Sequence, residues 1–170
     1  MKRSAFWFIY VLLVIVQLLL TNYLRVSPYL MLTILPVLVM CISIRVGTVA
    51  VMLIAFVTGL TVDYLTEGML GLNALALVPV AFLRNGIIRL VFGTELFARE
   101  EDFSTQRNGF WKAAQAILIA QIVFLAIYIW VDGAGMRTLS FNAIRFAVSL
   151  VAGTLLSLLT LGILAPDTHR

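Results

Sequence analysis

The stretch from Val26 to Val62 contains a single charged residue, Arg45, among 37 mostly apolar residues. As one helix it would reach about 55 Å, whereas the hydrocarbon core of a bilayer is about 30 Å thick. The stretch must therefore fold back on itself, and a turn is expected at Ser43–Gly47, where Arg45 suits the membrane surface and Gly47 is flexible. A soluble domain is excluded, because hydrophobic residues make up 62% of the 170-residue chain and charged residues 12%, against about 25% charged residues in soluble domains.

Similar uncharged windows recur along the chain and predict its helices. The expected spans are residues 5–24, 26–44, 46–62, 68–88, 113–131 and 146–165, with a charged loop at 89–112. They predict one all-α domain over residues 1–170, a polytopic membrane bundle of six transmembrane helices. Pro36 should kink the second span, and Arg84 should extend to the membrane surface from the short fourth span.

The distribution of Lys and Arg predicts the orientation of this bundle. With the N-terminus inside, nine basic residues fall on the cytoplasmic side and three, Arg25, Arg137 and Arg145, on the outer side. Positive residues favour the cytoplasmic side of membrane proteins. Both termini and the 89–112 loop are therefore expected in the cytoplasm. The net charge of +4 is explained by these loops, and no nucleic-acid partner is expected.

The sequence offers few groups for catalysis or for binding a metal or cofactor. The one histidine, His169, lies near the end of the sequence, and the one cysteine, Cys41, lies in an apolar run. Asp63 and Glu67 form an i, i+4 carboxylate pair without a third ligand or a basic partner. Because an active site needs a nucleophile, an acid–base pair or a metal in a shaped pocket, we expect no enzyme, no cofactor and no metal site.

The break between the third and fourth spans is the most informative polar region. Gly59 and Asp63 are one turn apart on one helix face, and small residues let helices approach closely in lipid. Gly68 and Gly71 allow a tight re-entry, and Asn73 is expected to bond either free backbone groups or Asp63 itself. The break is either a functional site or a turn that merely caps two helices.

A second row of small residues, Ser149, Gly153 and Ser157, follows one face of the last span. It would admit a partner helix, but packing inside the bundle is the expected use. Gln17, Gln115 and Gln121 are polar residues within spans, and their side chains should form hydrogen bonds between helices, mostly inside the bundle.

The runs at residues 55–63 and 68–76 resemble the central signature of the bacterial rod shape-determining protein MreD family. An aromatic residue and a glycine precede an aspartate by seven and four residues, and a Leu-Gly-Leu-Asn-Ala sequence follows. The matching positions, to which Gly68 is adjacent, are Phe56, Gly59, Asp63, Gly71, Leu72, Asn73 and Ala74.

This resemblance implies a non-enzymatic scaffold in the bacterial cytoplasmic (inner) membrane, within the machinery that elongates the cell wall. The implied partners are the single-pass protein MreC, the MreB filament, and a peptidoglycan synthase composed of RodA and a penicillin-binding protein. Cell shape would depend on such a subunit.

Two other functions stay open at this point. A small-solute carrier, such as the substrate-binding subunit of an energy-coupling-factor vitamin transporter, also fits a compact six-helix chain, and short glycine-interrupted spans mark transport sites. Against it, the outer loops lack a dense cluster of polar residues. A purely structural bundle without a specific partner would tolerate substitution at Gly59 or Asp63.

Overall fold

The computed structural model describes residues 3–23, 29–66, 69–93, 109–133 and 137–164. Within these ranges all regular secondary structure is helical. The helices are α1 (Arg3–Tyr23), α2 (Leu35–Met40), α3 (Thr48–Leu65), α4 (Leu72–Phe92), α7 (Phe110–Asp132) and α8 (Leu139–Leu164). Apart from α2, all five are long and apolar enough to cross a membrane. The all-α prediction is confirmed, and the long apolar helices are those expected of a multi-pass membrane protein.

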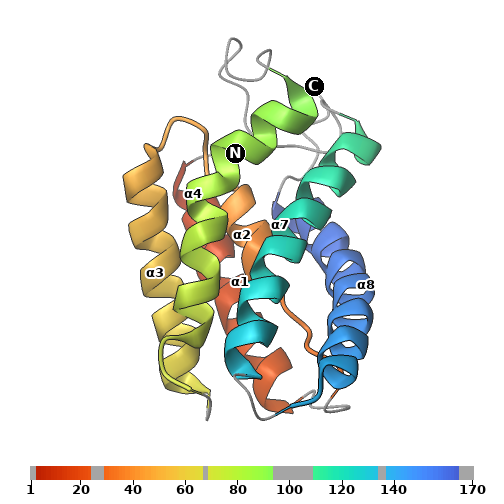
Figure 1. Ribbon diagram of the computed structural model, residues 1–170. Coiled ribbons are helices and arrows are strands. Elements are labelled where there is room, and N and C mark those ends of the chain that lie inside the picture. Colours follow the sequence, from red (N-terminus) through yellow and green to blue (C-terminus); the bar gives the residue numbers. More distant parts are fainter. Residues whose placement is uncertain (1–2, 24–28, 67–68, 94–108, 134–136, 165–170) are drawn as a thin grey trace.

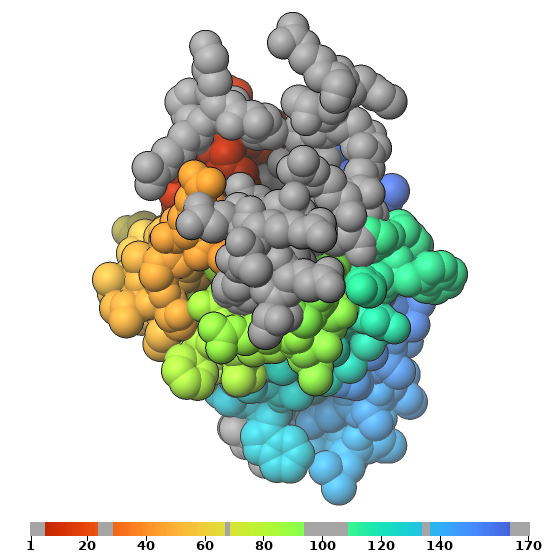
Figure 2. Space-filling model, turned by 90° about the horizontal axis from the view of Figure 1, so that it is seen from above, coloured from red at the N-terminus to blue at the C-terminus, as the bar shows by residue number. Residues whose placement is uncertain are grey.

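The long helices form a bundle in which α1 and α3 run in the same direction, because the chain returns between them through α2 (Figure 1). Helices α3, α4, α7 and α8 lie side by side in that order, α1 lies behind them, and α2 lies in the interior (Figure 1). Viewed from the end where α4 finishes, the start of α3, the end of α4 and the start of α7 follow one another around the molecule (Figure 2). Neighbouring elements in the sequence are therefore mostly neighbours in space.

Most predicted spans differ from the observed helices only at their ends. Helix α4 begins and ends four residues later than the predicted 68–88 span, and α8 begins at Leu139 instead of residue 146. The early start of α8 brings Arg145 into the helix, where it forms an ion pair with Asp132 of α7. A charge that looked like part of a loop is thus accommodated by pairing. Residues 94–108 of the predicted 89–112 loop lie outside the described residues.

The predicted helix at residues 26–44 is wrong. Among residues 29–44 of this region, which the structure describes, only Leu35–Met40 is helical, and residues 30–34 are irregular. Pro36 lies in the first turn of α2, where its missing N–H costs nothing, and proline disfavours helix at the preceding residue. Pro36 therefore begins a short helix instead of kinking a long one. In the described part of the chain the expected six long helices are thus represented by five, together with residues 29–42, which we call the interrupted segment.

The interrupted segment lies at the centre of the hydrophobic core. Ile34, Leu38 and Met40 are completely buried, and the segment runs along the inside of the bundle from the end where α1 finishes toward the start of α3 (Figure 1). By contrast, the outer faces of the long helices expose large apolar side chains, such as Phe8 and Leu159. This pattern suits a bundle whose outer surface is solvated by lipid.

Candidate functional site

The carboxylate of Asp63, near the end of α3, caps the start of α4. Its Oδ1 accepts hydrogen bonds from the Asn73 backbone N–H at 3.0 Å and the Asn73 Nδ2 at 2.8 Å, and Oδ2 accepts one from the Ala74 N–H at 3.2 Å. The first N–H groups of a helix have no partner within the helix, and a negative charge there is stabilised by the helix dipole. Asp63 thus does for α4 what an N-cap side chain does, but from another helix. Of the two partners considered for the Asn73 side chain, free backbone groups and Asp63, the structure shows Asp63.

Gly59 allows α3 and α4 to touch at this point. A Cβ atom on Gly59 would lie 2.5 Å from the Cα and 2.6 Å from the N of Ala74, and 2.9 Å from the carbonyl carbon of Asn73. These neighbours are backbone atoms and cannot rotate away. Any larger residue at position 59 must therefore move α4 away from α3, which would also lengthen the hydrogen bonds to Asp63.

The turn before α4 depends on a second glycine. Gly71 has φ of +89°, a left-handed conformation that costs other residues about 1–2 kcal/mol. Leu72, which follows it, is buried. Gly68 and Glu67 lie outside the described residues.

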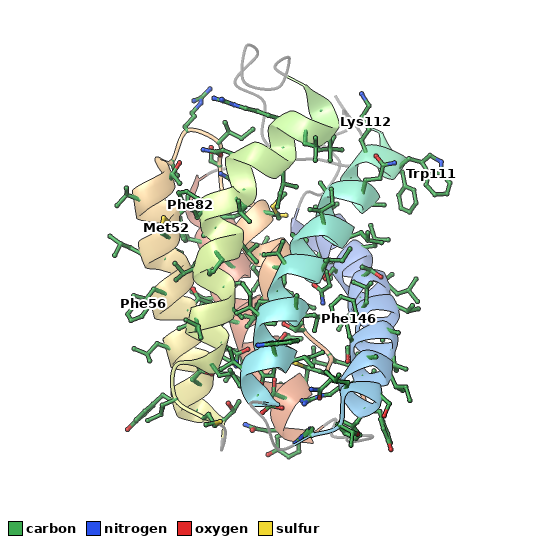
Figure 3. The ribbon with its side chains drawn as sticks, in the orientation of Figure 1. Met52, Phe56, Phe82, Trp111, Lys112 and Phe146 are labelled. Atoms are coloured by element: carbon green, nitrogen blue, oxygen red, sulfur yellow. The ribbon has the colours of Figure 1, made fainter. Side chains whose placement is uncertain are left out.

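Phe56 lies one turn before Gly59 and two turns before Asp63, at the exposed edge of the same side of α3. Its side chain is 47% exposed and points away from the bundle (Figure 3). Of the predicted site residues, the structure therefore brings together Gly59, Asp63, Asn73 and Ala74, and separates Phe56 from them. We call these four residues the α3–α4 junction.

The chemistry available at the α3–α4 junction is that of a buried anchor. Asp63 is only 2% exposed, and both of its oxygens accept hydrogen bonds. Within the described ranges, no three His, Cys, Asp or Glu residues come together in a group that could hold a metal ion. The junction fixes the angle and distance between two helices.

A second polar system surrounds the interrupted segment. Gln17 of α1 accepts a hydrogen bond from the Ile34 N–H on Oε1 at 2.8 Å and donates one from Nε2 to the Leu32 carbonyl at 3.2 Å. Non-helical backbone at membrane depth is tolerated only where its polar groups are bonded inside the protein. Gln17 supplies two of these bonds at once.

The small-residue face of α8 serves the same segment. Ser149 Oγ accepts a hydrogen bond from the Met31 N–H at 2.9 Å. One turn further on, a Cβ on Gly153 would lie 2.3 Å from Nε2 of Gln121, whose amide donates to the Thr33 carbonyl at 3.4 Å. Ser157 on the same face is fully buried. The expectation that this face packs internally is confirmed, and Gly153 is a glycine because the Gln121 side chain passes over it.

The prediction that Arg84 extends to the membrane surface is wrong. Arg84 of α4 is 1% exposed; its Nε donates to the Met40 carbonyl at 3.3 Å, and a terminal guanidinium nitrogen donates to the Ile42 carbonyl. Carbonyls at the end of a helix lack partners within it and attract positive charge. Arg84 thus caps the C-terminal end of α2. Arg84 lies eleven residues, or about three turns, after Asn73, which places both residues on the buried face of α4. This spacing is the feature of the sequence that could have shown that Arg84 faces the interior.

Comparison of the chain with protein-family models, with curated proteins and with solved structures gave no match in any of the three.

Proposed function

We propose that this chain is a non-enzymatic scaffold of the bacterial inner membrane, of the MreD type, which binds a single-pass partner and helps to position peptidoglycan synthesis. The observation that carries the proposal is the α3–α4 junction. Four of the seven positions that match the MreD signature meet there in one set of contacts. Because these residues act together on one helix pair, we infer that the signature holds α3 and α4 in a fixed arrangement. Such an arrangement would present a helix surface to a partner.

The proposed partner-binding surface is the outer face of α3, around Phe56. Phe56, which matches the MreD signature, is exposed and is directed away from the bundle (Figure 3). Packing against other helices of this chain therefore does not explain why position 56 is aromatic. The junction would set the angle at which α3 presents this face. An apolar, single-pass helix such as that of MreC is the partner that the resemblance implies.

Copurification tests this surface. Phe56→Ala should lower the amount of crosslinked single-pass partner per unit of membrane-inserted protein, since large aromatic anchors dominate many interfaces. Phe82→Ala is the matched control, because Phe82 is also exposed but lies on α4. Equal partner yield from the wild type and Phe56→Ala would exclude the surface. Depletion of the protein should disturb cell shape, whereas the purified chain should not turn over a wall precursor.

The proposal includes six crossings of the membrane with both termini in the cytoplasm, the interrupted segment being the second crossing. Cysteines introduced into a Cys41→Ala background test this. Positions 104 and 169 should be protected from an impermeant reagent in intact cells, and position 134 should be labelled. The opposite pattern would overturn the orientation, which rests on the count of basic residues.

A solute carrier is the second candidate, and the interrupted segment favours it. Transporters often place a substrate or ion site where a membrane helix is broken. Here, however, backbone groups of Met31, Thr33 and Ile34 are already bonded by protein side chains. A sample that retains a small molecule such as a vitamin through purification, and copurifies with no single-pass protein, would favour the carrier.

A further inference from the structure

The backbone at Thr33 lies between two glutamine side chains. On one side, Gln17 of α1 bonds the Leu32 carbonyl and the Ile34 N–H. The C=O and the N–H of a planar trans peptide point to opposite sides, and no peptide bond in the described residues is cis. The Thr33 N–H, which shares a peptide with the Leu32 carbonyl, therefore points away from Gln17. The Thr33 carbonyl, which shares a peptide with the Ile34 N–H, does the same, and there it meets Gln121 of α7.

Thr33 thus presents a donor and an acceptor to Gln121, but only one of these groups is bonded. Gln121 Nε2 donates to the Thr33 carbonyl at 3.4 Å, a longer contact than the usual 2.9–3.0 Å or so. The other amide atom, Oε1, has no partner within the described residues, and nothing in the described part of the chain accepts from the Thr33 N–H. Both residues are completely buried. One acceptor and one donor are therefore left over on two residues that are already in contact.

These two groups lie at the middle of the bundle. Gln121 is eleven residues from Phe110 and eleven from Asp132, the two ends of α7, which is about 16 Å of helix on either side. Its amide lies against α8, where a Cβ on Gly153 would be 2.3 Å from Nε2. Ser157, one turn further along this face of α8, also has a buried hydroxyl without a partner in the described residues. Unbonded polar groups at such a depth are costly, because neither lipid nor bulk water can bond them.

The chemistry of the leftover groups indicates what would bind them. A water molecule donates to the amide Oε1 and accepts from the backbone N–H, and buried waters typically bond polar groups that lack a protein partner. A cation would bond Oε1 but would be repelled by the Thr33 N–H and by Nε2 of Gln121. The acidic residues of the described ranges, Asp63 and Asp132, lie near the ends of α3 and α7. The groups therefore fit water and not a metal ion.

We propose that a water molecule bridges Oε1 of Gln121 and the backbone N–H of Thr33. Gln17 bonds one side of the interrupted segment directly, whereas Gln121 bonds the other side in part through this water. The site completes the hydrogen bonding that non-helical backbone needs at membrane depth. It is independent of the scaffold function, because it depends only on the core of the bundle.

NMR cross-relaxation between water and backbone amides tests the site in the isotope-labelled full chain in detergent micelles. The Thr33 amide should show a cross peak at the water frequency whose sign in a rotating-frame spectrum is opposite to that of the diagonal. Hydrogen exchange with the solvent gives the same sign as the diagonal. The Ile34 amide, which bonds Gln17 directly, is the internal control and should show no cross peak.

Two variants identify what holds the water. Gln121→Met keeps the length of the side chain but removes its amide, and the Thr33 cross peak should be lost. Thr33→Val removes the hydroxyl at position 33, and its backbone amide should keep the cross peak, which excludes transfer through that hydroxyl. Amide resonances of Asn73 and Ala74 that match the wild type show that a variant is folded.

Several outcomes would overturn the proposal. A Thr33 amide without a cross peak would mean that no water is bound there, and equal cross peaks at Thr33 and Ile34 would mean general access of solvent. A cross peak that survives in folded Gln121→Met, or that is lost in folded Thr33→Val, would also contradict it. A cross peak that appears only when choline replaces sodium would assign the position to a cation. The comparison of Thr33 with Ile34 in the wild type decides even where a variant does not fold.

Discussion

Replacing Asp63 by alanine should weaken the bundle by removing three hydrogen bonds at the start of α4. The bonds join its carboxylate to two backbone N–H groups and one side-chain amide. Hydrogen bonds to charged groups are worth about 1.5–3 kcal/mol in soluble proteins, but polar contacts in bilayers average about 0.6 kcal/mol. Because Tyr64 and Leu65 beside this site are exposed, solvent or headgroups can replace part of the loss. The expected decrease in the free energy of unfolding is about 2–4 kcal/mol.

Asp63→Asn removes the negative charge of this side chain and keeps its shape. An amide at position 63 keeps one acceptor oxygen but places an NH₂ group against the Ala74 N–H, and it loses the attraction between a carboxylate and a helix N-terminus, about 0.3–1 kcal/mol. The variant should therefore be intermediate, about 1–2 kcal/mol less stable than the wild type. Thr61→Ala is the control, since Thr61 is exposed and bonds to Val57 of its own helix.

Equilibrium unfolding by dodecyl sulfate in mixed micelles, followed by tryptophan fluorescence, measures these differences. A double-mutant cycle of Asp63→Ala with Asn73→Ala should give a coupling of about 1 kcal/mol. Asp63→Ala within about 0.5 kcal/mol of wild type, the range of neutral surface changes, would refute the reasoning. The yield of copurified partner per unit of inserted protein should fall in parallel, while insertion, which depends on hydropathy, should stay intact.

Three further substitutions test the close contacts elsewhere in the bundle. Gly59→Ala should destabilise the protein by about 1–3 kcal/mol through overpacking, whereas Gly86→Ala should be neutral or stabilising, because nothing lies within 4 Å of its Cβ position; unfolding in mixed micelles compares the two. Gln17→Leu should cost about 1–3 kcal/mol by leaving buried backbone groups unbonded, while Gln115→Leu, on an exposed position of α7, should cost nothing. Arg84→Gln should lower stability by about 1.5–3 kcal/mol, and equal stability of this variant and the wild type would show that α2 needs no cap.

The five long helices could be predicted because each is encoded by its own uncharged window. A helix across a bilayer needs about 20 apolar residues, and this requirement is local in the sequence. The α3–α4 junction was also accessible, because the spacing of Gly59 and Asp63 defines one face of α3 and Asn73 follows shortly after them in the chain. What the sequence left open was whether Asp63 faces water or α4, and the structure buries it.

Pro36 indicates where α2 begins, but the irregular backbone at residues 30–34 could not be predicted from the residues of the interrupted segment. Its apolar composition is that of a membrane helix, and the choice against a helix depends on bonds to side chains that are distant in the sequence. Gln17 lies 15 residues from Leu32, and Ser149 lies 118 residues from Met31. Gln17, Gln121 and Ser149 were recognisable as polar residues in spans, but their partners were backbone groups of a segment that hydropathy alone describes as helical.

Helix α4 connects the two polar systems of the bundle. Asn73 at its start is held by Asp63, and Arg84, about 16 Å further along the same face, holds the end of α2. A substitution that moves the start of α4, as a side chain at Gly59 must, therefore also moves Arg84 relative to the carbonyls that it caps. Pro79 lies between the two positions and removes one backbone hydrogen bond of the helix, which allows part of such a movement to be absorbed by bending. The junction and the core are thus connected through one helix, and a displacement of the start of α4 would also change the contacts that Arg84 makes at the centre of the bundle.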